Sequence, residues 1–400
     1  MPLSLSNASQ VDRWICRAFQ SMKALITFIE NLIAETNAAG GNVQELFTLK
    51  IPRKGYSRPW LYKSLEKRGP GLLTPQAWVC PIPNLRIKSL PPIATIGDLA
   101  AHLDLSVTEL EWFADLHQRN PIKGPLQHYH YRWIPRRKGP PRLLMEPKES
   151  LKITQRRILT TIINAIPLHD SAHGFVQGRS IKTFASEHTN QKTVLRMDLA
   201  DFFPSISFSR VSGMFQVFGY RAKVANLLAG LCTHQPPRSL ARLNRHLPQG
   251  APTSPALANI IAYRLDCRLA GLAKSAGLNY TRYADDLVFS GQTIRESFSH
   301  LVGGIILEEG FSVHHRKTRF MRSSTKQRVA GVVVNKHPNV DRRDFDRLKA
   351  ILHNCATKGP QSQGMSGQSR HLRGKISFVQ MLNPKRGEKL LKIFESIKWE

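Results

Sequence analysis

Acidic residues are scarce in this chain of 400 residues. Only 28 Asp and Glu stand against 58 Lys and Arg, so the formal net charge is +30. Such an excess produces a strong positive field and favours a polyanionic partner, either nucleic acid or a membrane surface. No apolar run is long enough to span a bilayer, and no basic-then-apolar signal segment occurs at the N-terminus. Nucleic acid is therefore the expected partner, with no membrane involved.

Cysteine is also sparse, and its spacing excludes two kinds of site. The five cysteines are widely scattered and form no Cys-x-x-Cys pair (Cys16, Cys80, Cys232, Cys267 and Cys355). This argues against a zinc module and against a disulfide framework, and it fits a reducing compartment. The neighbouring histidines at 128/130 and 314/315 have no acidic or cysteine partner nearby, so ordinary polar roles are favoured over metal ligation. We expect a cytoplasmic protein.

The composition is otherwise that of a globular protein, with 41% hydrophobic and 22% charged residues. The length suggests two or three domains, or one protein with several lobes. Apolar residues at three- and four-residue spacing predict an amphipathic helix over residues 10–36. Residues 50–75 are basic with interleaved aromatics, typical either of a nucleic-acid contact or of a solvated linker.

Five elements are predicted between residues 96 and 166. Residues 96–116 are expected to form two short helices, the second capped by Ser106 and Glu109 and burying Leu110, Trp112 and Phe113. A helix-turn-helix reader is the alternative, but the segment is acidic, which favours packing. Strands 129–134 and 142–145 form a basic hairpin. Residues 150–166 form an amphipathic helix, whose apolar positions are Leu151, Ile153, Ile158, Leu159, Ile162 and Ile163.

Tyr283-Ala284-Asp285-Asp286 is the most informative stretch. The flanking residues 278–282 and 287–291 are apolar, aromatic and β-branched, so they predict two short strands with the acidic pair at their turn. Two adjacent carboxylates repel each other and gain nothing as packing. They make sense if a divalent cation binds there, because hard cations take oxygen ligands. A solvated acidic turn is the alternative for this stretch taken alone.

Two further motifs precede the acidic pair. Residues 194–198 predict a strand that ends in Asp198. Residues 247–255 form a Pro/Gly loop that leads into a helix, with Ser254 as its N-cap and Pro255 in its first turn. Further on, residues 329–334 predict another strand, and roughly the last 60 residues are helical and basic, interrupted at 359–370.

This order suggests nucleotidyl transfer. Two-metal transfer needs carboxylates from separate strands that converge on a pair of Mg²⁺ ions about 4 Å apart. One ion lowers the pKa of the attacking hydroxyl, and the other neutralises charge on the leaving group. Asp198 and Asp285 are the candidate bridging ligands, and Asp286 completes or supports the site.

The motifs together resemble bacterial reverse transcriptases, most closely the retron reverse transcriptases. The matching segments are Arg196-Met197-Asp198-Leu199-Ala200-Asp201-Phe202-Phe203-Pro204, Leu247-Pro248-Gln249-Gly250-Ala251-Pro252-Thr253-Ser254-Pro255 and Tyr283-Ala284-Asp285-Asp286. Supporting matches are His173-Gly174-Phe175, Gly178-Arg179-Ser180 and Lys317-Thr318. The resemblance covers roughly residues 95–400.

The resemblance implies an α+β fold of the right-hand polymerase type. A mainly helical N-terminal extension of unknown role would span residues 1–95, followed by N-terminal helices and fingers over 96–193. The palm, with an antiparallel sheet and helices, would span 194–335. The basic helical thumb would span 336–400 and suit a template–primer duplex held by its shape.

The resemblance also implies roles for individual residues. Asp198, Asp285 and Asp286 would be catalytic and would bind the two Mg²⁺ ions, and Lys317 would act as a cation or proton donor near pyrophosphate. The residues that would contact the dNTP are Phe203, Gln249, Arg142 and Lys138. Phe203 would be the steric gate that excludes a 2′-OH. Gln249 would line the pocket, while Arg142 and Lys138 would clamp the triphosphate.

The implied function is RNA-directed DNA polymerisation on a structured non-coding RNA that serves as both template and primer. The product would be an RNA–DNA duplex, and the context anti-phage defence, with an associated effector protein as a further partner. Two segments depart from the retron pattern: Phe184-Ala185-Ser186-Glu187-His188 lacks an Asn, and Val329-Ala330-Gly331 lacks a Thr. A non-retron bacterial reverse transcriptase therefore stays open, as does a non-catalytic RNA-binding scaffold.

Overall fold

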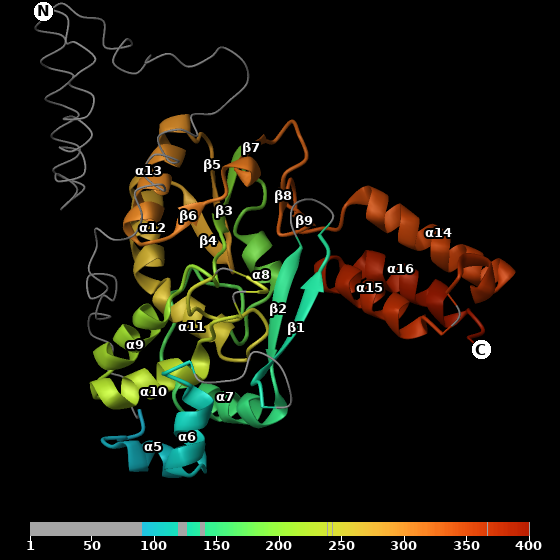
Figure 1. Cartoon of the computed structure of the whole chain (residues 1–400). Coiled ribbons are helices and arrows are strands. Elements are labelled where there is room, and N and C mark those ends of the chain that lie inside the picture. The colour runs from blue at the N-terminus through green and yellow to red at the C-terminus, as the bar shows by residue number, and fades with distance from the viewer. Residues whose placement is uncertain are drawn as a thin grey trace, which may run out of the picture. The chain divides into compact units, whose positions relative to one another are not determined.

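The computed structural model of the chain describes residues 90–118, 126–136, 141–237, 239–241, 243–365 and 367–399. Figure 1 shows the arrangement of the helices and strands in this part of the chain. The expected helix over 10–36, the basic stretch 50–75 and Lys138 lie outside the described residues.

A five-stranded antiparallel sheet lies at the centre of the segment predicted to be the palm. Its strands follow the order β4-β5-β3-β6, and β7 also pairs with β3. Their bounds are β3 Thr193–Ala200, β4 Asn279–Tyr283, β5 Asp286–Gly291, β6 Ser312–Val313 and β7 Arg319–Arg322. Every residue of β5 is buried, as expected for a central strand covered on both faces. The hairpin predicted around the acidic pair is confirmed.

Helices pack around this sheet. Their bounds are α9 Phe208–Val217, α10 Ala222–Cys232, α11 Ser254–Ile261, α12 Tyr263–Ser275 and α13 Glu296–Glu308. Helix α12 contacts β4, α13 contacts β6, and the two helices contact each other, as Figure 1 shows. Helix α10 is buried along most of its length because it packs on both α9 and α6. None of the described helices has the length and apolar character needed to cross a bilayer.

The elements before the sheet follow the predicted order. They are α5 Ile96–Leu103, α6 Val107–Ala114, β1 Tyr129–Ile134, β2 Arg142–Pro147, α7 Glu149–Thr161, the 3₁₀ turn η4 Ile163–Ala165 and α8 Ile181–Ser186. The capping box of Ser106 and Glu109 is present. Strands β1 and β2 form the predicted antiparallel hairpin.

Two apolar residues in this region are not buried, contrary to the sequence prediction. Trp112 is 40% exposed and Ile153 is 52% exposed. The buried residues of α6 are Leu110 and Ala114, so Trp112 lies to one side of the packed stripe. Helix α7 likewise buries Leu151, Thr154, Gln155 and Ile158, and Ile153 lies off that stripe.

The C-terminal part is helical, as predicted. Its elements are α14 Arg342–Lys358, the 3₁₀ turn η6 Pro360–Gln363, α15 Ser369–Leu382 and α16 Pro384–Glu395. The single strand expected over 329–334 is wrong. Two short strands, β8 Arg328–Val329 and β9 Val332–Val333, form a hairpin instead. Ala330 and Gly331 both take positive φ, 42° and 90°, which turns the chain back on itself.

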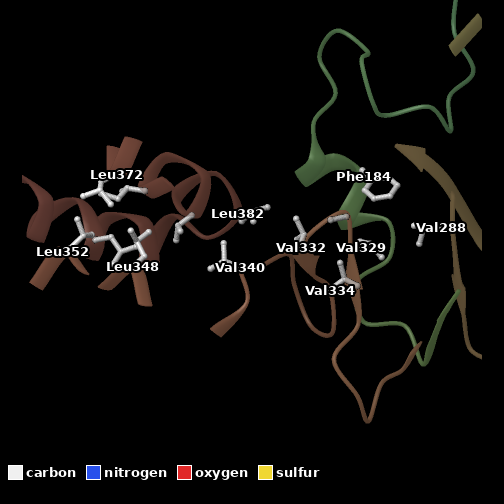
Figure 2. Close-up of a cluster of buried hydrophobic side chains, with 14 of the residues drawn as sticks. Phe184, Val288, Val329, Val332, Val334, Val340, Leu348, Leu352, Leu372 and Leu382 are labelled. Atoms are coloured by element: carbon white, nitrogen blue, oxygen red, sulfur yellow. The ribbon is translucent and has the colours of Figure 1, made fainter. Parts of the chain in front are cut away.

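A buried apolar cluster joins this hairpin to the C-terminal helices. Figure 2 shows Val329, Val332 and Val334 between Phe184 and Val288 on one side and the side chains of α14 and α15 on the other. Leu348, Leu352, Leu372 and Leu382 supply the helical side of the cluster. Since each fully buried aliphatic side chain contributes about 1.5–3 kcal/mol, this cluster couples the helices to the sheet.

His188 connects β4 to β5 through a buried pair of hydrogen bonds. Its Nδ1 lies 2.7 Å from Ser290 Oγ, and its Nε2 lies 2.7 Å from Thr281 Oγ1. Burial, with a smaller effect from His173, lowers the pKa of His188 from 6.5 to about 3. The imidazole is therefore neutral in the folded protein at neutral pH.

We expect acid to destabilise the protein through His188. Because the pKa is lowered on folding, the unfolded chain takes up a proton below pH 6.5 while the folded chain does not. The contribution of His188 to the free energy of unfolding should fall by about 1.4 kcal/mol for each pH unit below that value. Urea unfolding at pH 7 and 5 measures this, and His188→Gln should flatten the dependence. The exposed His371→Gln is the matched control, and an equal flattening there would contradict the assignment.

Candidate active site

Three carboxyl groups from two separate segments converge at one end of the sheet. Asp198 on β3 stands opposite Asp286, the first residue of β5, in the antiparallel register. Asp285 lies in the turn before β5, and its carbonyl accepts a 2.9 Å hydrogen bond from the Leu199 amide. Ala284 completes the turn with φ +56°, a left-handed conformation that is uncommon for a residue with a Cβ. The structure thus brings together the three acids that the sequence selected.

Burial and the neighbouring charges set the pKa values in this cluster. Burial raises the pKa of Asp286 to about 6, against the opposing charge and hydrogen bonds of Arg196. The Arg196 guanidinium donates to Asp286 Oδ1 from Nε at 3.0 Å and from Nη2 at 2.7 Å. Burial also raises the pKa of Asp285, and the charge of Asp198 adds to that rise. The carboxyls therefore repel one another unless cations balance them.

Lys317 is the second cation of the cluster. It lies in the 3₁₀ turn η5, His315–Lys317, and its Nζ donates to Asp198 Oδ1 at 2.7 Å. The turn is tied to β3 because the His314 amide donates to the Asp198 carbonyl at 2.7 Å. The sequence placed Lys317 near pyrophosphate and did not anticipate this contact with Asp198.

Arg196 was missed by the sequence analysis. The signal that could have found it is the period of two along a strand, which places residues 196 and 198 on the same face. On that face the Arg196 guanidinium contacts Asp286, which stands opposite Asp198 on the neighbouring strand β5.

The donor chemistry of the cluster fits a divalent metal. Among the residues that the structure describes, no group of three or more His, Cys, Asp or Glu side chains is already arranged as a metal site. The acids nevertheless offer the hard oxygen ligands that such ions take. Their mutual repulsion, and the ammonium and guanidinium drawn to Asp198 and Asp286, indicate a site that stabilises bound positive charge.

Phe203 lies in a turn that follows β3, five residues after Asp198 along the chain. Asp201 begins this turn with φ +45°. The Phe203 ring is half-buried, packs against Phe202 at 5.7 Å between centroids, and faces Phe175 at 6.3 Å. Phe175 is 49% exposed and itself has φ +62°, a strained conformation of the kind found at functional sites. Phe175 belongs to the matched segment His173-Gly174-Phe175, for which the resemblance implied no role.

The Gln249 loop packs directly on β2. The Gln249 carbonyl accepts from the Met145 amide at 2.7 Å. Gly250 has φ +126°, and a Cβ there would lie 2.8 Å from the Met145 carbonyl oxygen, so only glycine fits. Gln249 Oε1 is buried and has no hydrogen-bond partner among the described residues, which suits a ligand that donates a hydrogen bond.

The helix after this loop starts one residue earlier than predicted. Thr253 is its N-cap, and Ser254 is the first residue of α11. The Ser254 hydroxyl instead donates to the Pro248 carbonyl at 2.8 Å, which closes the loop on itself.

Arg142 is exposed at the start of β2. Its positive charge lowers the pKa of Asp285, so it lies within electrostatic reach of the acids. Its role as a clamp on the triphosphate stays a prediction. Its proposed companion, Lys138, lies outside the described residues.

Segment 171–174 runs against the turn that carries Asp285. Ala172 pairs with Arg282 as a parallel bridge. A Cβ on Gly174 would lie 2.6 Å from the Ala284 amide nitrogen and 3.1 Å from the Tyr283 carbonyl carbon. Both neighbours are backbone, so neither can swing aside. Glycine at 174 is what lets this segment approach the turn.

We therefore expect Gly174→Ala to displace the turn that carries Asp285. A misplacement near 1 Å costs on the order of 100-fold in rate, so dNTP incorporation should fall by about 10- to 100-fold. Single-turnover incorporation on an RNA template measures this.

Gly271→Ala is the matched control for this change. It lies on α12, where an added Cβ meets nothing within 4 Å. Its rate should be unchanged and its stability raised by up to about 1 kcal/mol, as for Gly→Ala within a helix. Equal rates for the two variants would contradict the steric account of Gly174.

Comparison with known proteins agrees with this geometry. The family described as reverse transcriptase (RNA-dependent DNA polymerase) matches residues 134–334. This range contains the sheet, the three acids and the Gln249 loop. The chain belongs to the reverse transcriptases, RNA-directed DNA polymerases with the α+β right-hand fold, a family that in general uses a divalent metal and dNTPs.

Within that family the chain is similar to retron enzymes. It is 43% identical to the retron Mx65 reverse transcriptase of Myxococcus xanthus over 312 residues, covering 75% of this chain and 71% of the relative. It is 38% identical to the Mx162 enzyme of the same organism, covering 76% and 67%. Retron Ec86 reverse transcriptase of Escherichia coli is 30% identical, with 77% and 91% covered. The polymerase is therefore of the retron type, as predicted.

Solved structures with a similar course include a foamy viral protease-reverse transcriptase in complex with double-stranded DNA. The TM-score is 0.35 at 15% identity, with 69% of this chain and 45% of that chain covered. A second foamy viral structure, in complex with an RNA/DNA hybrid, gives the same score and identity and covers 70% and 35%.

Proposed function

We propose that this retron-type reverse transcriptase copies a structured non-coding RNA into DNA by two-metal nucleotidyl transfer in the cytoplasm. The observation that supports it most is the pairing of Asp198 with Asp286 across β3 and β5, with Asp285 beside them in the turn. Three acids from two separate segments of the chain are what a pair of Mg²⁺ ions needs. The same pairing would serve no purpose in a packing role, because it costs repulsion.

The acids would bind the metal ions, and the neighbouring cations would balance their charge. Asp198 and Asp285 would hold both ions and Asp286 would complete the site. The ions would activate the primer hydroxyl and neutralise charge on the triphosphate. Lys317 and Arg196 would balance the acids before the ions bind, since each now contacts one carboxylate. Once Lys317 is displaced from Asp198, its ammonium would be free to face the leaving pyrophosphate.

The nucleotide would lie between the acids and Phe203. Phe203 would stack under the sugar and exclude a 2′-OH, so that dNTPs are selected. Gln249 would use its unpartnered Oε1 to accept a hydrogen bond from the nucleotide. Arg142 would bind the triphosphate from the β1–β2 hairpin, because its charge already reaches Asp285. Lys138, which lies between β1 and β2 in the sequence, would join it.

The C-terminal helices would hold the RNA and the RNA–DNA duplex product. Their exposed faces carry many cations, among them Arg342, Arg343, Arg347, Lys349, Arg373, Lys375, Lys385 and Lys389. Such a surface binds phosphates, and an A-form duplex is recognised by its shape and backbone. The bound RNA would supply both template and primer, with a 2′-OH as the primer hydroxyl.

Sequencing of the RNA that copurifies with the protein tests the partner. We expect one enriched, structured RNA species with inverted repeats, encoded near the gene. A mixture that mirrors total cellular RNA would contradict a dedicated partner.

We further propose a role in anti-phage defence together with an effector protein. It rests on the resemblance to retron enzymes. Plating efficiency of a phage panel on cells that carry the natural locus, with and without Asp285→Asn, tests it. Equal plating across the panel would contradict the role and leave the polymerase assignment intact.

A further inference from the structure

A second charged cluster lies inside the protein, next to the catalytic turn. Arg282 on β4 and Asp266 on α12 form an ion pair in which both side chains are 0% exposed. Arg282 Nε donates to Asp266 Oδ1 at 2.8 Å, and Nη2 donates to Oδ2 at 2.6 Å, so the pair is bidentate. Tyr280 adds a third hydrogen bond, from its hydroxyl to Asp266 Oδ1 at 2.8 Å.

The remaining guanidinium nitrogen of Arg282 reaches the turn itself. Nη1 donates to the Ala284 carbonyl at 3.1 Å and to Asn259 Oδ1 at 2.9 Å. Asn259 on α11 also contacts the segment on the other side of the turn, because its Nδ2 donates to the Gly174 carbonyl at 2.8 Å. One buried side chain thus links the residue before Asp285 to the segment that supports the turn from the other side.

The backbone of Arg282 is tied to the same segment. Its amide donates to the Ser171 carbonyl at 2.7 Å, and its carbonyl accepts from the His173 amide at 2.8 Å. The guanidinium carbon also lies 5.8 Å from the ring centroid of Phe202, the neighbour of Phe203. Arg282 therefore contacts the catalytic turn, the supporting segment and the turn that carries Phe203.

Stability alone does not account for such a network. A buried ion pair is weak as a source of stability, because well-packed apolar residues of similar volume often serve as well. The turn that carries Asp285, in contrast, needs contacts from surrounding residues to keep its conformation. Ala284 has φ +56°, and a strained residue of this kind persists only where its surroundings determine its conformation.

We propose that Arg282, assisted by Asp266 and Asn259, is a positioning residue that fixes the Asp285 turn relative to the Gly174–Phe175 segment. The inference rests on the proposed catalytic role of Asp285. It predicts that weakening the network slows nucleotidyl transfer without weakening the binding of RNA, since none of these three side chains faces the solvent.

Arg282→Lys and Asn259→Asp test the proposal on the full chain with its copurified RNA. Lysine keeps the charge beside Asp266 but cannot also reach Asn259 and Ala284. Asn259→Asp keeps the acceptor for Arg282 and removes the donor to the Gly174 carbonyl. In each variant kcat at saturating dNTP should fall by about 10- to 100-fold, as for a misplaced catalytic group, while the Kd for RNA stays at the wild-type value.

Arg210→Lys is the matched control for a buried arginine. Arg210 is 1% exposed and donates to the Glu309 carbonyl at 3.0 Å, at the end of α13. The Tm of every variant is measured by thermal unfolding and reports how far each substitution destabilises the fold. The three variants are compared at a similar drop in Tm. The positioning role of Arg282 is supported if Arg282→Lys and Asn259→Asp lose more kcat than Arg210→Lys.

Two results would overturn the inference. The first is wild-type kcat in both Arg282→Lys and Asn259→Asp. The second is a kcat loss no larger than that of Arg210→Lys at the same drop in Tm. Asp285→Asn separates this failure from failure of the proposed function. If Asp285→Asn is inactive and Arg282→Lys is fully active, only the positioning role of Arg282 is contradicted. If Asp285→Asn is active, the catalytic role of Asp285 is itself contradicted.

Discussion

Asp285→Asn should abolish RNA-templated DNA synthesis. The substitution keeps the size and shape of the side chain but removes the charge that would hold two cations between Asp198 and the turn. We expect the rate of dNTP incorporation to fall by at least about 10³-fold, the scale of losing a principal catalytic group. The affinity for RNA should be retained, because the cationic surface of the C-terminal helices is untouched. Primer extension with labelled dNTP, beside RNA binding by the same preparation, measures both quantities.

Asp201→Asn is the matched control for Asp285→Asn. Asp201 lies three residues beyond Asp198, is exposed, and has φ +45°, a conformation that asparagine tolerates well. It should retain synthesis within about twofold, because asparagine keeps the size of the side chain and adopts the same positive φ. If the two variants keep similar rates, Asp285 is not a metal ligand and the site has been assigned to the wrong acids.

Phe203→Ala should open the enzyme to ribonucleotides. The half-buried ring packs on Phe202 in the turn after β3, and in the proposed site it would meet a 2′-OH on the sugar of an incoming nucleotide. Removal of the ring should lower the ratio of kcat/KM for dNTP to kcat/KM for rNTP by about 100-fold. This is the scale of discrimination that contacts in a binding pocket provide. Incorporation of each nucleotide, measured separately on the same RNA, gives this ratio.

Phe203→Tyr is the matched variant, because it keeps the ring and adds only a hydroxyl. It should preserve discrimination close to that of the native enzyme. Loss of synthesis in Phe203→Ala with unchanged discrimination would indicate a packing role. The Phe203 ring already contacts Phe202 and Phe175, so such a role has a structural basis and the ratio decides between the two.

Local patterns in the sequence were enough to predict the hairpin that carries Asp285 and Asp286. Strand-forming residues on both sides of an acidic pair leave few other arrangements, and β4 and β5 form the expected antiparallel pair. The capping box of Ser106 and Glu109 was predictable for the same reason, since both partners lie within four residues.

Long-range partners were not predictable in this way. Arg282 meets Asp266 from 16 residues away, and Arg196 meets Asp286 from 90 residues away. The period of two along β3 could place Arg196 on the face of Asp198, but nothing local identifies the acid that either arginine meets in a chain of charge +30. The sheet register and the packing of α12 on β4 decide which cation faces which acid.

Errors of burial and turn position have a similar cause. Apolar spacing alone did not show that Trp112 and Ile153 lie beside their packed stripes, because that depends on which face a neighbouring helix covers. The run 329–334 was taken as one strand, since its β-branched residues mask the turn at Ala330 and Gly331.

The most direct measurement uses the purified protein with its copurified RNA, Mg²⁺ and labelled dNTPs. We predict labelled DNA that is complementary in sequence to the bound RNA, joined to it through a 2′-OH, and absent from the Asp285→Asn preparation. Tight RNA binding with no DNA synthesis in either Mg²⁺ or Mn²⁺ would contradict the account, because the chain would then act as an RNA-binding scaffold.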